Sequence, residues 1–182
     1  YGYMKNMGRG ELDQFIIDMT QDLNKKDALI FDLRYNTGGN IHDEVLKFLS
    51  QKTYLNWKYR EGSLTQQSNF SPSDKPIVLL INEQSLSDAE MTAQGFKALK
   101  LGTIIGNETY RWIIFTSGVG LVDGSSVRMP GWGCYSLDGK DLEMSGVQPD
   151  IKIINSFEDK INGRDPQVDK AVDEILKQLG KK

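Results

Sequence analysis

The strongest constraint on the fold is a strand–loop–helix pattern that occurs twice along the chain. Residues 28–33 and Ile77–Ile81 are apolar runs of strand length, and each is followed by a loop. Apolar residues at helical spacing begin after each loop. Short apolar runs of this kind suit strands that are buried on both faces of a parallel sheet. The sequence therefore predicts an α/β fold, a mostly parallel sheet flanked by helices.

The remaining segments fit this architecture. Apolar spacing predicts helices over residues 11–24, 41–49 (with Asn40 as the cap), 87–100 and 168–179. Short strands are expected within residues 1–7, 102–106 and 143–154, a hairpin within 54–70, and antiparallel strands within 109–139. The apolar stripe of the last helix is typical of core packing, with docking of a partner as the alternative.

Composition excludes several classes of function. The 182 residues suffice for one domain with a hydrophobic core, residues 1–182. The net charge of −3 gives no electrostatic basis for binding nucleic acid or an anionic membrane. A single cysteine, Cys134, and a single histidine, His42, leave no internal disulfide and no multi-cysteine or two-histidine metal site. We expect no cofactor and no metal.

Ser87 occupies a special place in the second unit, between a buried strand and a helix. Free backbone N–H groups at a helix start can hold an oxyanion while a serine there attacks a carbonyl. The spacing Ser87-x-x-Glu90 is equally that of a capping box, and the two interpretations are compatible. Because ligands sit at the carboxyl ends of parallel strands, Gly38, Gly39 and Ser87 are expected to converge on one pocket.

Four ordered motifs carry a resemblance to a known family. They are the block Ala28 to Gly39 with its Asp-x-Arg-x-Asn-x-Gly-Gly end, Ser87-Asp88-Ala89-Glu90, Gly106-Asn107-Glu108-Thr109, and Gly146-Val147-Gln148-Pro149-Asp150-Ile151. Their order and spacing resemble the carboxyl-terminal processing and tricorn serine peptidases. The stretch Gly163 to Ala171 is similar to the tricorn branch in particular. The resemblance covers essentially the whole chain and implies a ClpP/crotonase-like fold with endopeptidase chemistry.

The resemblance also implies roles for individual residues. Ser87 matches the nucleophile, with Ser85 as the weaker candidate. The oxyanion hole would use the backbone N–H of Asp88 and that of Gly38 or Gly39. Fixed backbone donors suit this role because they are in place before the charge develops.

Two departures from the motifs indicate the subtype. Processing peptidases activate the serine with a lysine, and the chain has Arg111 in that region, which is a poor base because arginine stays protonated. The tricorn type uses Ser, His, Ser and Glu, and by position its glutamate is Glu143; a solvated loop carboxylate is the alternative. His42 matches no catalytic position. The resemblance therefore implies that the general-base histidine comes from an upstream segment.

These inferences predict the carboxyl-terminal half of a peptidase core within a longer protein, with negligible activity in isolation. Expected partners are a peptide substrate, the upstream segment and further copies of the chain. A preference for basic side chains is not supported, since Glu61 is the one acidic residue in the stretch 54–62 where relatives place it. The aromatic residues Trp57, Tyr59, Trp112 and Trp132 suit either an apolar substrate pocket or strand packing. The competing interpretation is a non-catalytic module that binds apolar ligands or peptides.

Overall fold

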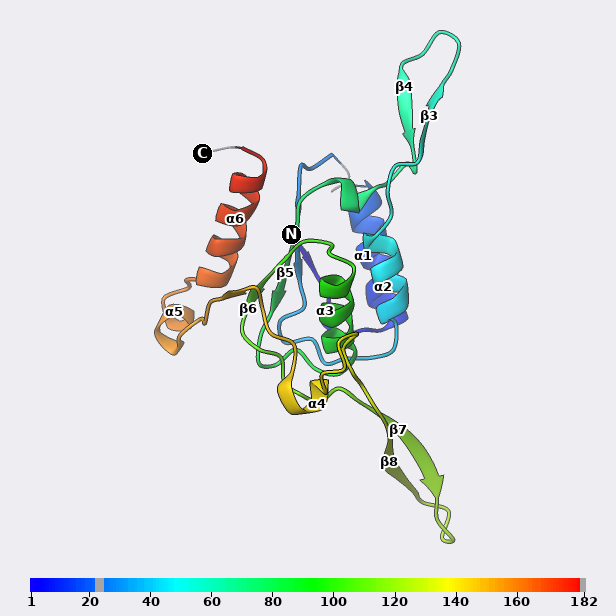
Figure 1. Ribbon diagram of the computed structural model, residues 1–182, viewed down its shortest axis with the longest axis vertical. Helices are drawn as coiled ribbons and strands as arrows, with labels where there is room; N and C mark the ends of the chain where they lie inside the picture. Colours follow the sequence, from blue (N-terminus) through cyan, green and yellow to red (C-terminus); the bar gives the residue numbers. More distant parts are fainter. Residues whose placement is uncertain (22–24, 181–182) are drawn as a thin grey trace.

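The computed structural model describes residues 1–21 and 25–180 and has a parallel sheet at its centre (Figure 1). Five strands are hydrogen-bonded in the order β1-β2-β5-β6-β9, and every neighbouring pair is parallel. They are β1 (Gly2–Tyr3), β2 (Leu29–Asp32), β5 (Ile77–Ile81), β6 (Thr103–Gly106) and β9 (Ile151–Lys152). The predicted α/β class and the mostly parallel sheet are confirmed.

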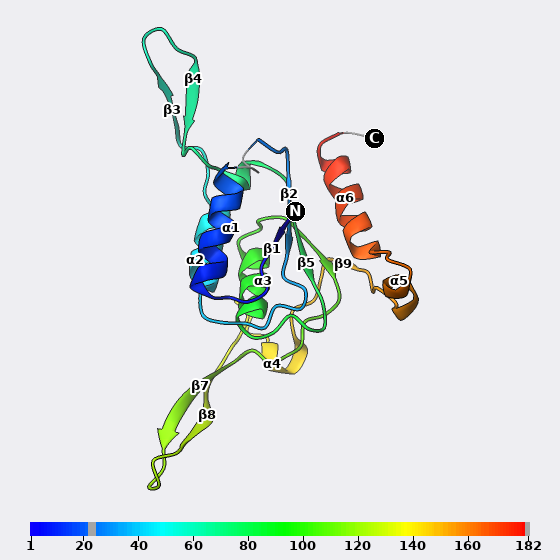
Figure 2. The ribbon, with the colours of Figure 1, turned by 180° about the vertical axis from the view of Figure 1, so that it is seen from behind.

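Helices cover both faces of the sheet (Figures 1 and 2). One face carries α1 (Arg9–Gln21), α2 (His42–Leu49) and α3 (Asp88–Ala98), and the other carries α6 (Pro166–Gln178). The predicted last turn of the first helix, at Leu23 and Asn24, lies outside the described residues. None of the helices in the described ranges is both long and apolar enough to cross a membrane.

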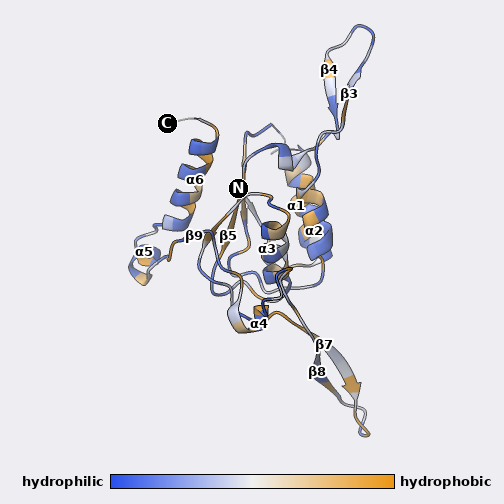
Figure 3. Ribbon diagram, viewed as in Figure 1, coloured by the Kyte–Doolittle hydropathy of each residue, from blue (hydrophilic) through white to orange (hydrophobic). Residues whose placement is uncertain are grey.

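The central strand β5 shows why the core has two halves. All five of its residues are buried, and its apolar character is visible in Figure 3. Successive side chains of a strand point to opposite faces. Ile77 and Leu79 accordingly pack in the core under α1–α3, while Val78 and Leu80 pack with α6. The stripe of α6 is thus core packing, with Val172 left 42% exposed beside it.

Two antiparallel hairpins project from opposite ends of the molecule (Figure 1). The first pairs β3 (Leu55–Lys58) with β4 (Leu64–Gln67), and the second pairs β7 (Ile114–Gly120) with β8 (Ser126–Gly133). Both confirm the expected antiparallel segments. Three short helical turns were not predicted from the sequence: η1 (Pro72–Asp74), α4 (Leu142–Ser145) and α5 (Phe157–Ile161).

The predicted cap of α2 is wrong by one residue. Ile41, not Asn40, holds the N-cap position, and it has no capping side chain of its own. The Ile41 N–H instead donates to the Asp88 carboxylate at 2.7 Å. A buried carboxylate from α3 therefore holds the start of α2, and local sequence spacing gives no sign of it.

A buried charge network ties β2 to the start of α6. The Arg34 guanidinium donates to Asp32 at 2.7–3.0 Å, to Asp165 at 2.9 Å and to Gln167 at 3.0 Å. Burial raises the pKa of Asp165, but hydrogen bonds from Asn155, from the Val168 N–H and from Arg34 outweigh it and hold that pKa below the ordinary value. The two sequence motifs at 32–39 and 163–171 are therefore joined directly through the side chain of Arg34.

Candidate active site

Ser87 lies in the turn between β5 and α3 with an unusual backbone. Its φ of 52° and ψ of −110° fall in a region that non-glycine residues rarely adopt. Such strain costs about 1–3 kcal/mol and persists where the surroundings enforce it, often at functional sites. Ser87 is half-buried, whereas Ser85 is fully buried and its hydroxyl donates to the Leu33 carbonyl at 2.8 Å. Of the two serines, only Ser87 is therefore within reach of a ligand.

The glycine loop after β2 passes directly beside Ser87. A Cβ built on Gly38, where φ is +81°, would lie 2.9 Å from the Ser87 Cβ. A Cβ on Gly39 would lie 1.9 Å from the Met7 carbonyl oxygen, so that no side chain fits there. Both positions need glycine because the backbone approaches its neighbours too closely for any other residue.

Asn36 holds this loop against the turn that carries Ser87. Its carbonyl accepts a hydrogen bond from the Leu86 N–H at 2.9 Å. Its fully buried side chain donates to the Met4 carbonyl at 2.7 Å and accepts from the Gly38 N–H at 2.9 Å. The two loops that were expected to converge are thus joined by direct hydrogen bonds.

Two backbone N–H groups beside Ser87 make no hydrogen bond within the described part of the chain, those of Gly39 and Asp88. The Gly38 carbonyl and the Asn40 N–H both bond Met7, so the Gly39 N–H between them points away from Met7. Asp88 is the first residue of α3, where an N–H has no partner within the helix. The Gly38 N–H, by contrast, is engaged by Asn36.

Glu90 is the buried centre of the site. Its carboxylate is 0% exposed and accepts hydrogen bonds from the N–H groups of Ser87, Arg111 and Trp112, each at 2.9 Å, and from the Thr109 hydroxyl at 2.6 Å. The glutamate arm of the predicted capping box is therefore present. It also fixes the loop after β6, which carries Trp112, to the backbone of Ser87.

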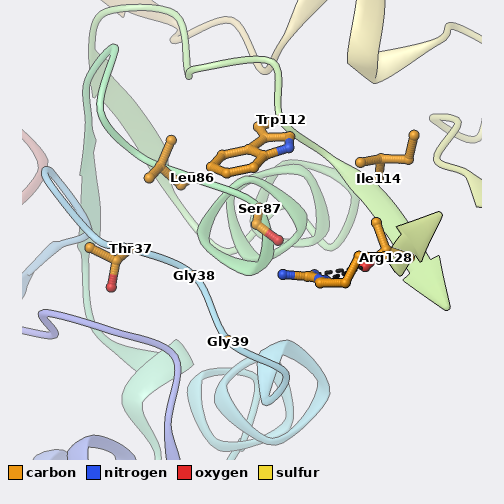
Figure 4. Close-up of a pocket in the computed structure, with 9 residues that line it drawn as sticks. Thr37, Gly38, Gly39, Leu86, Ser87, Trp112, Ile114 and Arg128 are labelled. Carbon is orange, nitrogen blue, oxygen red and sulfur yellow. Dashed lines mark hydrogen bonds between the residues drawn. The ribbon is translucent and has the colours of Figure 1, made fainter. Parts of the chain in front are cut away.

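Ser87 opens into a cavity of about 620 Å³, a size typical of ligand pockets. The lining residues are Thr37, Gly38, Gly39, Leu86, Ser87, Trp112, Ile114, Thr116 and Arg128. In Figure 4 the Ser87 hydroxyl lies between the Trp112 ring and the Gly38–Gly39 loop, and it is directed toward the Arg128 guanidinium. The cavity wall opposite the glycine loop belongs to the β7–β8 hairpin.

The Asp88 carboxylate turns away from this cavity. One oxygen accepts from the Ile41 N–H, and the other is 2.5 Å from the His42 Nδ1. His42 is not among the residues that line the cavity. It therefore sits behind Asp88, the residue that follows Ser87, and fixes the start of α3 against α2.

Glu143, the predicted catalytic glutamate, and Arg111, at the place of the family lysine, both lie outside the cavity lining. Glu143 is exposed in the first turn of α4, and its backbone N–H donates to Asp141. Among the described residues its side chain makes no hydrogen bond or ion pair. Arg111 donates to Glu108 at 2.6 Å, and this hydrogen bond raises the pKa of the guanidinium, which stays charged. Arg111 is therefore a poor base, as expected from the sequence.

Sequence reasoning assigned no role to two residues of the site. Asn36 and Arg128 carried no assigned role, although the Asn-x-Gly-Gly pattern could have pointed to Asn36. Of the four aromatic residues considered for a substrate pocket, Trp112 lines the cavity, while the exposed residues Trp57, Tyr59 and Trp132 do not. No group of three or more potential metal ligands exists within residues 1–21 and 25–180.

Comparisons with known proteins agree with this arrangement. The family model for peptidase family S41 matches residues 2–153. The tricorn protease of Thermoplasma acidophilum is 30% identical over 181 residues, covering 98% of this chain and 17% of its own length. A tricorn protease homolog of Saccharolobus solfataricus is 33% identical over 157 residues, covering 85% and 14%.

A solved structure extends the likeness to three dimensions. The crystal structure of the tricorn protease superposes with a TM-score of 0.89 at 28% identity, over 100% of this chain and 18% of that one. The chain thus spans less than a fifth of the length of these tricorn relatives. The parallel sheet, the Asp-x-Arg-x-Asn-x-Gly-Gly loop and the serine turn lie within the matched residues, and the chain belongs to the serine peptidases of family S41.

Proposed function

We propose that this chain is the nucleophile-bearing part of a tricorn-like serine endopeptidase core. The Ser87 oxygen attacks the carbonyl carbon of a peptide bond and passes its proton to a base. The tetrahedral intermediate collapses, the C–N bond breaks, and the amine leaves with that proton. Water then hydrolyses the acyl ester on Ser87 and restores the hydroxyl.

The negative oxygen of the intermediate would be held by the N–H groups of Asp88 and Gly39. Both are free of other partners within the described residues and flank Ser87. Gly38 is the poorer donor of the pair Gly38 and Gly39, because its N–H already bonds Asn36 at 2.9 Å. Fixed donors of this kind typically supply about 2.7–4 kcal/mol of transition-state stabilisation each.

The base would be a histidine from a segment upstream of Tyr1 in the full-length protein. The single histidine of the chain, His42, is bonded to Asp88 and does not line the cavity. Glu143 would orient that histidine or its partner serine, as a carboxylate does in other serine hydrolases. Its exposed, unbonded side chain is available for such a contact. Assembly with further copies of the chain belongs to the same proposal.

The observation that carries the proposal is the backbone of Ser87. Ser87 is a strained serine at the start of a helix, beside two N–H groups that are free among the described residues and at the wall of a cavity of about 620 Å³. Packing alone requires no such arrangement. A capping role would be satisfied by an unstrained residue, since typical N-cap residues have β-region angles.

The test is covalent labelling of the full-length protein by a serine-reactive phosphonate. We expect one label, located at Ser87 by mass spectrometry and absent from Ser87→Ala. The matched control is Ser63→Ala, which removes an exposed hydroxyl in the β3–β4 turn and should leave labelling unchanged. Hydrolysis of peptides should follow the same pattern, and residues 1–182 alone should hydrolyse them negligibly because no base is present.

Two outcomes would contradict the proposal. Hydrolysis by residues 1–182 alone that is lost in Ser87→Ala would show that the base lies within this chain. Saturable binding of an apolar dye or a peptide by the full-length protein, with no labelling of Ser87, would favour the non-catalytic binding module.

A further inference from the structure

Arg128 stands out in the cavity because nothing in the peptidase proposal uses it. It is the one charged side chain among the described residues that line the larger cavity. It also lines an adjoining cavity of about 240 Å³, together with Gly39 and Ser87. Figure 4 shows its guanidinium on the side toward which the Ser87 hydroxyl points.

The hairpin places this side chain by simple strand geometry. Ile114 and Thr116 both line the cavity, although the pairing of the two strands is irregular between Phe115 and Thr116. Beyond that point Thr116 and Gly118 alternate with Ser117 along β7 and so share one face. Arg128 is paired across the hairpin with Gly118, the next residue on that face. Because Gly118 has no side chain, the arginine can lie back along the hairpin toward Ser87.

Thr116 then fixes the direction of the guanidinium. Its hydroxyl accepts from the Arg128 Nε at 3.0 Å and from Nη2 at 2.7 Å. A guanidinium has five N–H groups, so these two bonds leave the Nη1 group and one N–H of Nη2 free as a fork. Such a fork matches the two oxygens of a carboxylate.

Arg128 has no counter-charge of its own. No carboxylate among residues 1–21 and 25–180 lies within ion-pair distance of it. Asp88 lines the adjoining cavity together with Arg128, but its carboxylate is engaged by the Ile41 N–H and by His42. An oriented, unpaired cation beside the nucleophile favours a negatively charged ligand and repels a positive one.

We propose that Arg128 selects peptides that present a carboxylate next to the scissile bond. This inference rests on the proposed peptidase function and adds the class of substrate to it. The carboxylate can come from a Glu or Asp side chain or from the carboxyl terminus of a short peptide, since both offer the same two oxygens to the fork.

The experiment measures kcat/KM of the full-length protein on two matched peptide series. The first series is amidated at its carboxyl terminus and carries Glu, Gln or Lys next to the cleaved bond. The second carries Gln there and ends one to three residues beyond the bond as a free acid or an amide. The variants are Arg128→Gln and, as the matched control on the other hairpin, Arg60→Gln.

We expect Arg128→Gln to lower kcat/KM about tenfold for the peptides whose carboxylate the arginine binds. The kcat/KM of the neutral peptides should stay unchanged. Loss of a hydrogen bond to a charged group lowers binding at least about tenfold. Because Arg128 is exposed to solvent, we expect a loss near the lower limit of this range. Arg128→Glu should invert the preference from Glu to Lys. If kcat/KM falls only in the first series, the carboxylate that Arg128 binds is a substrate side chain. If it falls only in the second series, that carboxylate is the carboxyl terminus of the peptide.

If Arg128→Gln cleaves the peptides and the ratio of kcat/KM between acidic and neutral peptides is the same as in the wild type, the inference is overturned and the peptidase proposal stands. If no peptide is cleaved, the peptidase proposal fails, and the binding of the same peptides to Ser87→Ala decides about Arg128. Equal affinity for the acidic and neutral peptides would then overturn the inference. Tighter binding of the acidic peptides that is lost on adding Arg128→Gln would support it.

Discussion

Replacing Glu90 by glutamine keeps the shape of the side chain but removes half of its capacity to accept hydrogen bonds. One carboxylate oxygen accepts from the N–H groups of Ser87 and Trp112, and the other accepts from the Arg111 N–H and the Thr109 hydroxyl. An amide has one oxygen and one NH2 group. In either orientation of the amide, at least one buried backbone N–H therefore faces another donor.

The expected loss of stability follows from this count of hydrogen bonds. The Thr109 oxygen already accepts from the Val147 N–H and has a second lone pair that can accept from the new NH2 group. The cheaper orientation therefore leaves the Arg111 N–H and the Thr109 O–H without the acceptor they have in Glu90. A hydrogen bond to a charged group is worth about 1.5–3 kcal/mol, and an unsatisfied buried donor adds to the loss. We expect Glu90→Gln to lower the free energy of unfolding by about 2–4 kcal/mol. For a domain of this size that lowers the melting temperature by roughly 4 to 16 °C.

The assay is urea unfolding of residues 1–182, followed by circular dichroism. Glu44→Gln is the matched control, because Glu44 is the third residue of α2 as Glu90 is the third residue of α3. Both changes remove a charge from the first turn, which is worth about 0.3–1 kcal/mol. Only Glu90 is buried and bonded in this way, since Glu44 is exposed.

Equal losses in the two variants, both below about 1 kcal/mol, would refute the reasoning, because they would leave only the charge effect of the first turn. Labelling of Ser87 in the full-length protein gives a second readout. The Glu90→Gln variant, still folded, should react more slowly with the phosphonate, as its turn and the Trp112 loop are no longer fixed together.

Three further predictions concern the charge network around Arg34 and the glycine loop. Arg34→Met leaves the Asp32 carboxylate buried without its partner and should lower the free energy of unfolding by about 3–5 kcal/mol; a loss below about 1 kcal/mol would contradict the network. Hydrogen bonds outweigh burial and hold the pKa of Asp165 below its ordinary value of 3.8, so its contribution to stability is present above that pH and is lost as the pH falls through the lowered pKa. The stability difference between wild type and Asp165→Asn should accordingly shrink between about pH 6 and about pH 3, and a constant difference would argue against the ion pair. Gly39→Ala would place a Cβ 1.9 Å from the Met7 carbonyl oxygen, and the displaced loop should abolish labelling of Ser87 in a protein that still folds.

The sequence predicted the framework of the fold because that framework depends on local patterns. The buried run of β5 and the helical stripe of α6 each bury apolar residues at a regular spacing, and such spacing is visible without a structure. The positions of Gly38, Gly39 and Ser87 around one cavity followed from the rule for parallel sheets.

Contacts between distant segments could not be predicted in the same way. Asp88 holds the start of α2 from 47 residues away, and Arg34 bonds Asp165 across 131 residues. Arg128 enters the cavity only because a hairpin folds back toward the glycine loop, and neither its spacing nor its neighbours in the sequence indicate this. The catalytic role of Glu143 stays a prediction, since its side chain makes no hydrogen bond or ion pair with another described residue and does not line the cavity.

The β7–β8 hairpin has a consequence for how such a peptidase can evolve. No residue of its two strands is buried, yet Ile114, Thr116 and Arg128 form one wall of the cavity. The serine turn and the glycine loop, by contrast, are fixed by buried groups of the core. Mutations in the hairpin can therefore change which ligands fit the cavity while leaving the fold, the serine turn and the glycine loop intact. In this architecture the wall of the cavity that comes from the hairpin can change in evolution while the serine turn and the glycine loop stay the same.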